Sequence, residues 1–179
     1  VLQEQGFVHQ AIQQYEKILE LGAEEVENMG NLAAACLDLG NFHKAKEYCR
    51  LALQHNPHQS TTLLNLGKSL LRLGEFQQAE SCFAQALSLD PENSAIHCAL
   101  AELYDVLGYP QSASEHYQHA IQCDSNMITA YFGLSQHKIF KTDDPWFTDL
   151  STKINHVSAL QDKIDLYFTL GKMYQDIED

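Results

Sequence analysis

The sequence is poor in residues that interrupt regular structure. Only 4 of its 179 residues are proline and 9 are glycine, far too few for the many turns of an all-β protein. No stretch approaches the ~20 consecutive apolar residues of a membrane-spanning helix, and no signal peptide is visible at the start. With 45% hydrophobic and 20% charged residues, the composition is typical of a globular chain. We therefore expect a helical globular protein that does not use a membrane.

Positive charge is also scarce. Lys and Arg total 11 against 24 Asp and Glu, a formal net charge of −13. No Lys or Arg occurs from residue 73 to residue 137, a stretch that carries eight carboxylates. Nucleic-acid affinity comes from cations that displace counterions, so we expect no nucleic acid among the partners. The acidic stretch is either a solvated outer face or a cradle for a basic partner, and the sequence leaves both open.

The cysteines form no pairing motif. There are five, none lies in a CxxC pair, and each replaces a small apolar residue of a helical pattern: Cys36, Cys49, Cys82, Cys98 and Cys123. This arrangement argues against a disulfide framework. We expect reduced, buried thiols and a cytoplasmic protein.

What is present is a repeat of 34 residues. Several series of small, apolar and turn-forming residues recur at this one interval: Gly6, Gly40, Gly74 and Gly108; Ala11, Ala45, Ala79 and Ala113; Ala52, Ala86 and Ala120; Leu32, Leu66, Leu100 and Leu134; Pro57 and Pro91. A shared period indicates a repeat architecture. A single unit is too small to bury its apolar face alone, so the units must stack.

Each unit is predicted to contain two helices. In residues 27–39 the apolar residues recur at helical spacing, and Gly40 predicts a left-handed stop. Residues 42–55 form the second helix, which ends at an Asn-Pro or Asp-Pro pair. Its two alanines let the paired helix approach closely. Aromatic residues fill the remaining space: Tyr15, Phe42, Phe76, Phe83 and Tyr117. Pro110 falls early in a second helix, where its missing N–H is tolerated.

The third unit resembles the tetratricopeptide repeat in sequence form as well as period. It carries Asn65-Leu66-Gly67, Gly74-Glu75-Phe76, Ala79, Phe83, Ala86 and Asp90-Pro91. The resemblance covers residues 1–140 and implies an all-α, right-handed superhelical solenoid of antiparallel helix hairpins. The expected units are a partial repeat at 1–25, repeats at 26–59, 60–93 and 94–127, and a divergent repeat from 128.

Residues 141–179 depart from this pattern. The fifth unit begins with a helix predicted over residues 128–140, but Thr142 replaces the expected glycine. Asp144-Pro145 predicts the N-cap and first residue of a helix over 146–157.

A last helix is predicted over residues 162–177. It carries Leu170-Gly171 and Tyr174 at first-helix spacing, and no second helix follows. We therefore expect an incomplete hairpin at the end of a longer protein. Residues 128–179 are also similar to the segment that joins repeats to the catalytic domain in bacterial tetratricopeptide sulfotransferases. That resemblance implies a sulfotransferase domain downstream in the same polypeptide.

In this family the first helices line a concave groove, so the resemblance implies a protein or peptide ligand there. The matching positions that we select are Asn31, Asp38, Leu64, Asn65, Lys68, Arg72, Glu102, Asp105 and Phe132. Asn31 and Asn65 are equivalent residues one repeat apart, similar to the asparagine ladder of O-linked N-acetylglucosamine transferases. An amide offers both a donor and an acceptor, so it can pair with a peptide backbone. Alternatively, each amide bonds a neighbouring helix.

Signals for chemistry are absent. His116 and His119 lie three residues apart but lack two further metal ligands. No phosphate-loop, dinucleotide or nucleophile-elbow motif occurs. We expect no catalytic residue, metal or cofactor, and an interaction scaffold as the function. The alternative is a non-catalytic accessory module of a sulfotransferase.

Overall fold

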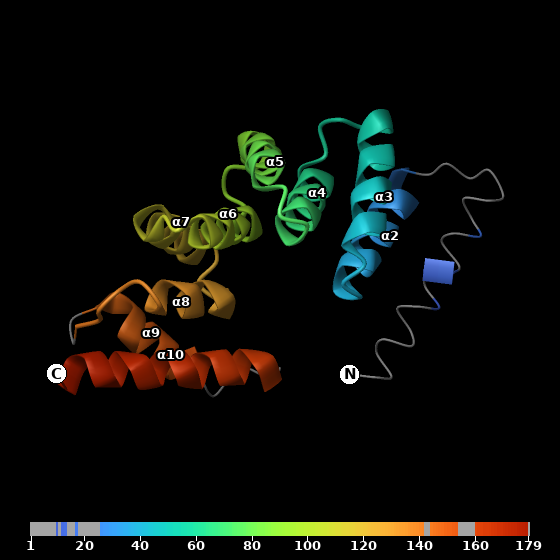
Figure 1. Ribbon diagram of the computed structural model, residues 1–179. Helices are drawn as coiled ribbons and strands as arrows, with labels where there is room; N and C mark the ends of the chain where they lie inside the picture. Colours follow the sequence, from blue (N-terminus) through green and yellow to red (C-terminus); the bar gives the residue numbers. More distant parts are fainter. Residues whose placement is uncertain are drawn as a thin grey trace. The chain divides into compact units, whose positions relative to one another are not determined.

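The computed structural model describes residues 10, 12, 13, 17, 26–141, 144–153 and 160–178. Their helices are α2 (Val26–Asp38), α3 (Phe42–His55), α4 (Ser60–Arg72), α5 (Phe76–Leu89), α6 (Ser94–Leu107), α7 (Pro110–Cys123), α8 (Ile128–Ser135), α9 (Pro145–Lys153) and α10 (Leu160–Glu178), shown in Figure 1. The predicted all-α fold is confirmed. Thr142 and most of the predicted partial repeat at 1–25 lie outside the described residues. No described helix is long and apolar enough to cross a bilayer.

The chain divides into two compact units, residues 1–91 and 92–179. In the first unit α2 pairs with α3 and α4 with α5, and α4 also contacts both α2 and α3. The repeated alanines of α3 and α5 are fully buried, as their small size predicts: Ala45, Ala52, Ala79 and Ala86. Phe83 is likewise buried and packs directly over Gly67, where an added Cβ would lie 2.4 Å from the ring.

Helices α2, α4 and α6 are each followed by a glycine in the left-handed region. Gly40, Gly74 and Gly108 have φ of 72°, 78° and 77°. At the first of these turns Gly40 N–H donates to Leu37 C=O at 2.9 Å, and Asn41 N–H donates to Cys36 C=O at 2.8 Å. This pair of bonds satisfies carbonyls that a helix end leaves open. The predicted left-handed stop is confirmed.

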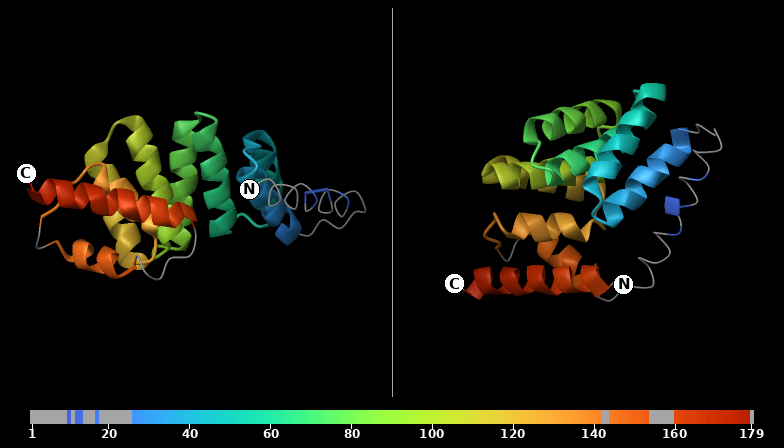
Figure 2. Two further views of the ribbon diagram at one scale, coloured as in Figure 1. Left: turned by 90° about the horizontal axis from the view of Figure 1, so that it is seen from below. Right: turned by 45° about the vertical axis from the view of Figure 1, so that its right-hand side comes forward.

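In the second unit α6 pairs with α7, α8 packs against α7 and α10, and α9 packs against α10. Figure 2 shows α10 running past α8 and α9. The core of this unit contains large buried side chains from both sides of residue 140: Tyr131, Leu134, Phe140, Leu150, Leu166 and Met173. One core thus joins the last repeat to the C-terminal helices. The predicted domain boundary at residue 140 stays a prediction.

Helix α8 is shorter than the sequence predicts. The predicted helix runs over residues 128–140, whereas α8 ends at Ser135. Phe140 lies beyond the end and is only 2% exposed, and its N–H donates to Asp176 Oδ2 at 3.1 Å. Beyond the end of α8, this hydrogen bond to α10 and the burial of Phe140 hold the chain against the C-terminal core.

Helix α9 begins at Pro145, as predicted. The preceding Asp144 accepts the Lys141 N–H at 2.8 Å and pairs with the Lys138 ammonium. Its carboxylate therefore binds residues before the helix, in a role that the predicted N-cap did not include.

Candidate functional site

The predicted asparagines lie on adjacent helices of the first unit. A Cβ added at Gly30 of α2 would lie 3.7 Å from Thr62 Oγ1 of α4, so the two first helices are in contact there. Next to this contact Asn31 is exposed and Asn65 is half-buried. Within the described part of the chain, neither side-chain amide has a hydrogen-bond partner, so no bond to a neighbouring helix is seen for either.

The other predicted residues of this face differ in accessibility. Asp38 and Arg72 are exposed and Lys68 is half-buried one turn before Arg72. Leu64 is only 7% exposed, so its side chain offers almost no surface to a partner and serves the core instead.

In the second unit the predicted carboxylates already have interaction partners within the protein. Tyr117 Oη donates to Asp105 Oδ2 at 2.8 Å, and His137 Nε2 lies 2.6 Å from Asp105 Oδ1. Burial, followed by the hydrogen bond to Asp105, raises the pKa of Tyr117 well above its usual value. Glu102 is half-buried and also has an interaction partner. These residues stabilise the unit, which limits what they can offer a ligand.

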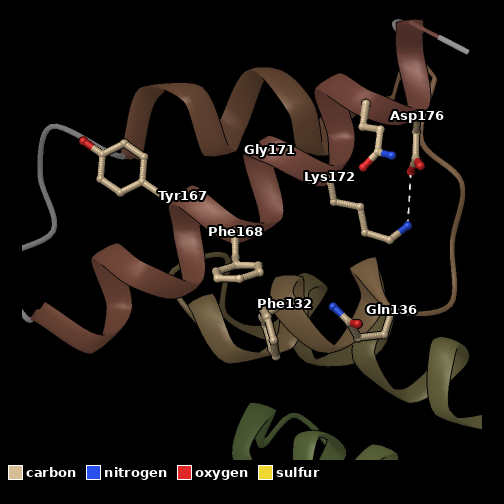
Figure 3. A pocket seen from close by; sticks show the side chains of 8 residues that line it. Phe132, Gln136, Tyr167, Phe168, Gly171, Lys172 and Asp176 are labelled. Atoms are coloured by element: carbon tan, nitrogen blue, oxygen red, sulfur yellow. Dashed lines mark hydrogen bonds and ion pairs between the residues drawn. The ribbon is translucent and has the colours of Figure 1, made fainter.

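Phe132, the remaining predicted residue, lines a hollow of about 780 Å³ between α8 and α10. The lining residues are Phe132, Gln136, Tyr167, Phe168, Gly171, Lys172, Gln175 and Asp176. Phe132 and Phe168 face each other edge to face, with ring centroids 6.5 Å apart. Figure 3 shows this aromatic pair, with Gln136 and the Lys172–Asp176 pair beside it. Ligand sites are usually hollows of this size with a mainly apolar lining.

Helix α10 supplies six of the eight lining residues and also carries a second apolar stripe. Its core face is formed by Leu166, Thr169, Leu170 and Met173, all buried. A different face carries apolar side chains that are 44% to 76% exposed: Leu160, Ile164, Tyr167, Phe168 and Tyr174. A helix with one core face normally has polar residues elsewhere. The α10 residues of the hollow were not predicted from the sequence, although the first-helix motif around Gly171 and the apolar spacing of this second stripe are signals for them.

The two charged side chains that line the hollow form an ion pair with each other. Lys172 Nζ lies 3.4 Å from Asp176 Oδ2, and the same oxygen accepts the Phe140 N–H. The hollow therefore presents aromatic surface and amide groups without an uncompensated local charge.

Three histidines meet between α6 and α7. His97 Nδ1 lies 3.1 Å from His116 Nδ1, and the His97 ring stacks on His119 with centroids 5.3 Å apart. Burial, and then the charges of His97 and His119, lower the pKa of His116, while Glu115 opposes the shift. Among the described residues no group of three or more His, Cys, Asp or Glu is arranged to hold a metal ion. His97 was not predicted from the sequence, because it lies 19 residues from His116.

All five cysteines are free thiols, and four of them are buried. Burial first, and then neighbouring Cys82 and Cys36, raise the pKa of Cys49 to about 12. The predicted burial of the thiols is confirmed for Cys36, Cys49, Cys82 and Cys98, whereas Cys123 is half-buried. The cytoplasmic location stays a prediction.

Solved structures with the same fold are numerous. The chain is similar to MamA, with a TM-score of 0.66 at 19% identity over 97% of this chain and 91% of that one. It is also similar to TTC0263, a thermophilic TPR protein of Thermus thermophilus, with a TM-score of 0.72 at 17% identity over 97% and 94% of the two chains. The TPR domain of Arabidopsis OM64 gives a TM-score of 0.60 at 22% identity over 63% and 93%. These likenesses show the fold.

No curated protein sequence matches the chain. The comparisons give no support for a sulfotransferase. Two family models described as Tetratricopeptide repeat match residues 24–92 and 64–128, which together are more than half of the 179 residues. Such repeats are generically scaffolds for protein–protein interaction and are typically non-catalytic. The chain belongs to the tetratricopeptide repeat family.

Proposed function

We propose that the chain is an interaction scaffold that binds an extended peptide along α2 and α4, with Asn31 and Asn65 pairing with the peptide backbone. The observation that carries this proposal is that the two equivalent amides lie on contacting helices and have no hydrogen-bond partner among the described residues. Each amide can donate to a peptide carbonyl and accept from a peptide N–H. Recognition through the backbone tolerates many ligand sequences, and neighbouring side chains such as Asp38 and Arg72 add selectivity.

The test is a double substitution, Asn31→Ala with Asn65→Ala. A ligand peptide is first selected from a displayed random library on the wild-type chain, and its affinity for each variant is measured by calorimetry. Loss of two hydrogen bonds, each with a net value of about 1 kcal/mol, predicts at least about tenfold weaker binding. The melting temperature should stay near that of the wild type, because no hydrogen bond within the described residues uses either side-chain amide.

The matched control removes two exposed amides from second helices, Gln54→Ala with Gln77→Ala. This variant keeps full affinity if the peptide lies on the first helices. Equal losses in the two double variants, or full affinity in the asparagine variant, contradict the proposal.

The accessory role beside a sulfotransferase domain rests on the resemblance over residues 128–179 alone. No contact in the described residues favours it, so it remains a prediction. Sequence beyond residue 179 in the same reading frame tests it, because a phosphosulfate-binding domain would have to follow.

A further inference from the structure

We propose that the hollow between α8 and α10 is an anchor site for a basic peptide segment that inserts a large apolar side chain between Phe132, Phe168 and Gly171. The proposal extends the proposed scaffold function to the second unit, which the asparagines do not reach. It names the chemical class of the partner.

The aromatic lining is accessible and held in place. Phe168 is 70% exposed and Tyr167 is 63% exposed, yet both lie on α10, whose opposite face is fixed in the core by Leu166 and Met173. Phe132 meets Phe168 edge to face from α8. Exposed aromatic side chains on a rigid helix provide binding surface at little cost in conformational entropy.

Gly171 leaves room at the floor of the hollow. A Cβ placed there would have no neighbouring atom within 4 Å, although the residue sits inside a helix where glycine is unfavourable. The missing side chain exposes the helix surface between Phe168 and Gln175. A ligand side chain can therefore lie directly on the helix backbone.

The dimensions suit a short peptide. The lining residues of α10 run from 167 to 176, about 13 Å along the helix at 1.5 Å per residue. An extended chain advances ~3.3 Å per residue, so about four peptide residues lie along the hollow. Gln136 and Gln175 are both exposed beside it. Gln136 Nε2 donates to Ser135 Oγ at 3.1 Å, so the Gln136 side-chain oxygen and the Gln175 amide are the groups that can bond the backbone of such a segment.

Charge selects a basic partner. Residues 92–179 contain 13 Asp and Glu against 5 Lys and Arg. The two charges in the hollow itself, Lys172 and Asp176, are paired with each other. The attraction therefore comes from the net negative charge of residues 92–179 as a whole, which raises the local concentration of positively charged ligands, while the apolar insertion fixes their position.

The test uses fluorescently labelled synthetic peptides whose central residue is flanked by lysines and arginines. The version with a central phenylalanine should bind the full chain at least about tenfold more tightly than the version with serine, because a large apolar side chain is removed from water. A version with glutamates in place of the cations should bind more weakly than either. Equal affinities for the phenylalanine and serine peptides, or no binding of the phenylalanine peptide, overturn the proposal.

Two substitutions in the protein, one that fills the hollow and one that removes part of its wall, test whether the peptide binds there. Gly171→Leu fills the hollow and Phe168→Ala removes one wall, and each should weaken the phenylalanine peptide by about tenfold. The matched control is Ile164→Ala, which truncates an exposed apolar residue of the same helix outside the hollow and should leave affinity unchanged. Because the Gly171 site is open, Gly171→Leu is expected to remain folded, which its melting curve checks. Wild-type affinity in Gly171→Leu, or an equal loss in Ile164→Ala, overturns the proposal.

The outcome is separable from that of the proposed function. If Asn31→Ala with Asn65→Ala weakens the library peptide while Gly171→Leu leaves the basic peptide unaffected, the scaffold function stands and the anchor site fails. The alternative occupant of the hollow is a second copy of this chain. Sedimentation of the chain without peptide tests this alternative by measuring its oligomeric state. A dimer that Gly171→Leu dissociates would mean that the hollow is a self-association site, and it would overturn the assignment to a basic peptide.

Discussion

Two helical glycines of this chain have opposite surroundings. At Gly67 an added Cβ would lie 2.4 Å from the ring of the fully buried Phe83, whereas at Gly171 it would meet nothing within 4 Å. Gly67→Ala should lower the free energy of unfolding by about 1–3 kcal/mol through overpacking. Gly171→Ala should raise it by up to about 1 kcal/mol, because alanine favours the helix. Urea unfolding of the two variants measures both values. Equal signs for the two changes would contradict the packing described here.

Alkaline pH should destabilise the chain through buried acids. The folded-state pKa of Cys49 is raised from 9.0 to about 12, mainly by burial, and that of Tyr117 is raised by burial and by Asp105. The unfolded chain therefore releases these protons first, and stability that is complete below about pH 9 is lost as pH rises above it. Melting temperatures across this range test the direction. In the variant Tyr117→Phe the decline above about pH 10 should be shallower, since one of the two acids is gone.

The structural roles of single residues could be predicted from the sequence wherever they depend only on the local backbone and on short-range spacing. The small residue at Ala45, the left-handed glycine at Gly40 and the tolerated Pro110 each follow from backbone sterics and short-range spacing. Asp105 shows the limit. Its repeat position predicts a groove residue, but its carboxylate is held by Tyr117 and His137, and a pairing of this kind depends on side-chain directions that a repeat pattern does not encode.

At the scale of single helices, α6 has a well-formed N-terminal cap. Asn93 Oδ1 accepts the N–H groups of Ala95 and Ile96 at 3.1 and 3.3 Å. Asn93→Ala should therefore cost about 1 kcal/mol of stability. The comparison is Asn41→Ala at the start of α3, where the only described cap bond is the longer 3.4 Å contact with Lys44 N–H. The loss in the Asn41 variant should be smaller, as chemical unfolding of both variants will show.

The α6–α7 pair should weaken in acid. The folded-state pKa of His116 is lowered below 6.5 by burial and by its histidine neighbours. The unfolded chain therefore binds the proton first as pH falls, and stability present above about pH 6.5 is lost below it. Wild type and His116→Gln are to be melted at about pH 7.5 and about pH 5.5. The wild type should lose more on acidification than the variant, with the exposed His58→Gln as a control that behaves like wild type.

Helix boundaries could be predicted where the helix follows the 34-residue repeat pattern. The predicted range of residues 42–55 coincides with α3, because a proline pair and a glycine turn flank it. The predicted range of α8 was wrong at its end: the helix ends at Ser135, and Phe140 beyond it enters the core and bonds Asp176, 36 residues later in the sequence. The hollow was missed for the same reason: it forms only where α8 and α10 come together.

At the scale of the whole molecule, the net charge of −13 should make ligand binding sensitive to salt. The screening length falls to ~8 Å at physiological ionic strength and to ~3 Å at 1 M. The affinity of the chain for the basic phenylalanine peptide should therefore decline steadily as sodium chloride is added, whereas the preference for phenylalanine over serine should persist, because apolar burial is not screened. Fluorescence anisotropy titrations of both peptides over a salt series separate the two contributions. An affinity that does not change with salt would show that the negative charge of the chain does not attract the ligand. A preference for phenylalanine that disappears with salt would show that the peptide is held by charge alone and does not insert into the hollow.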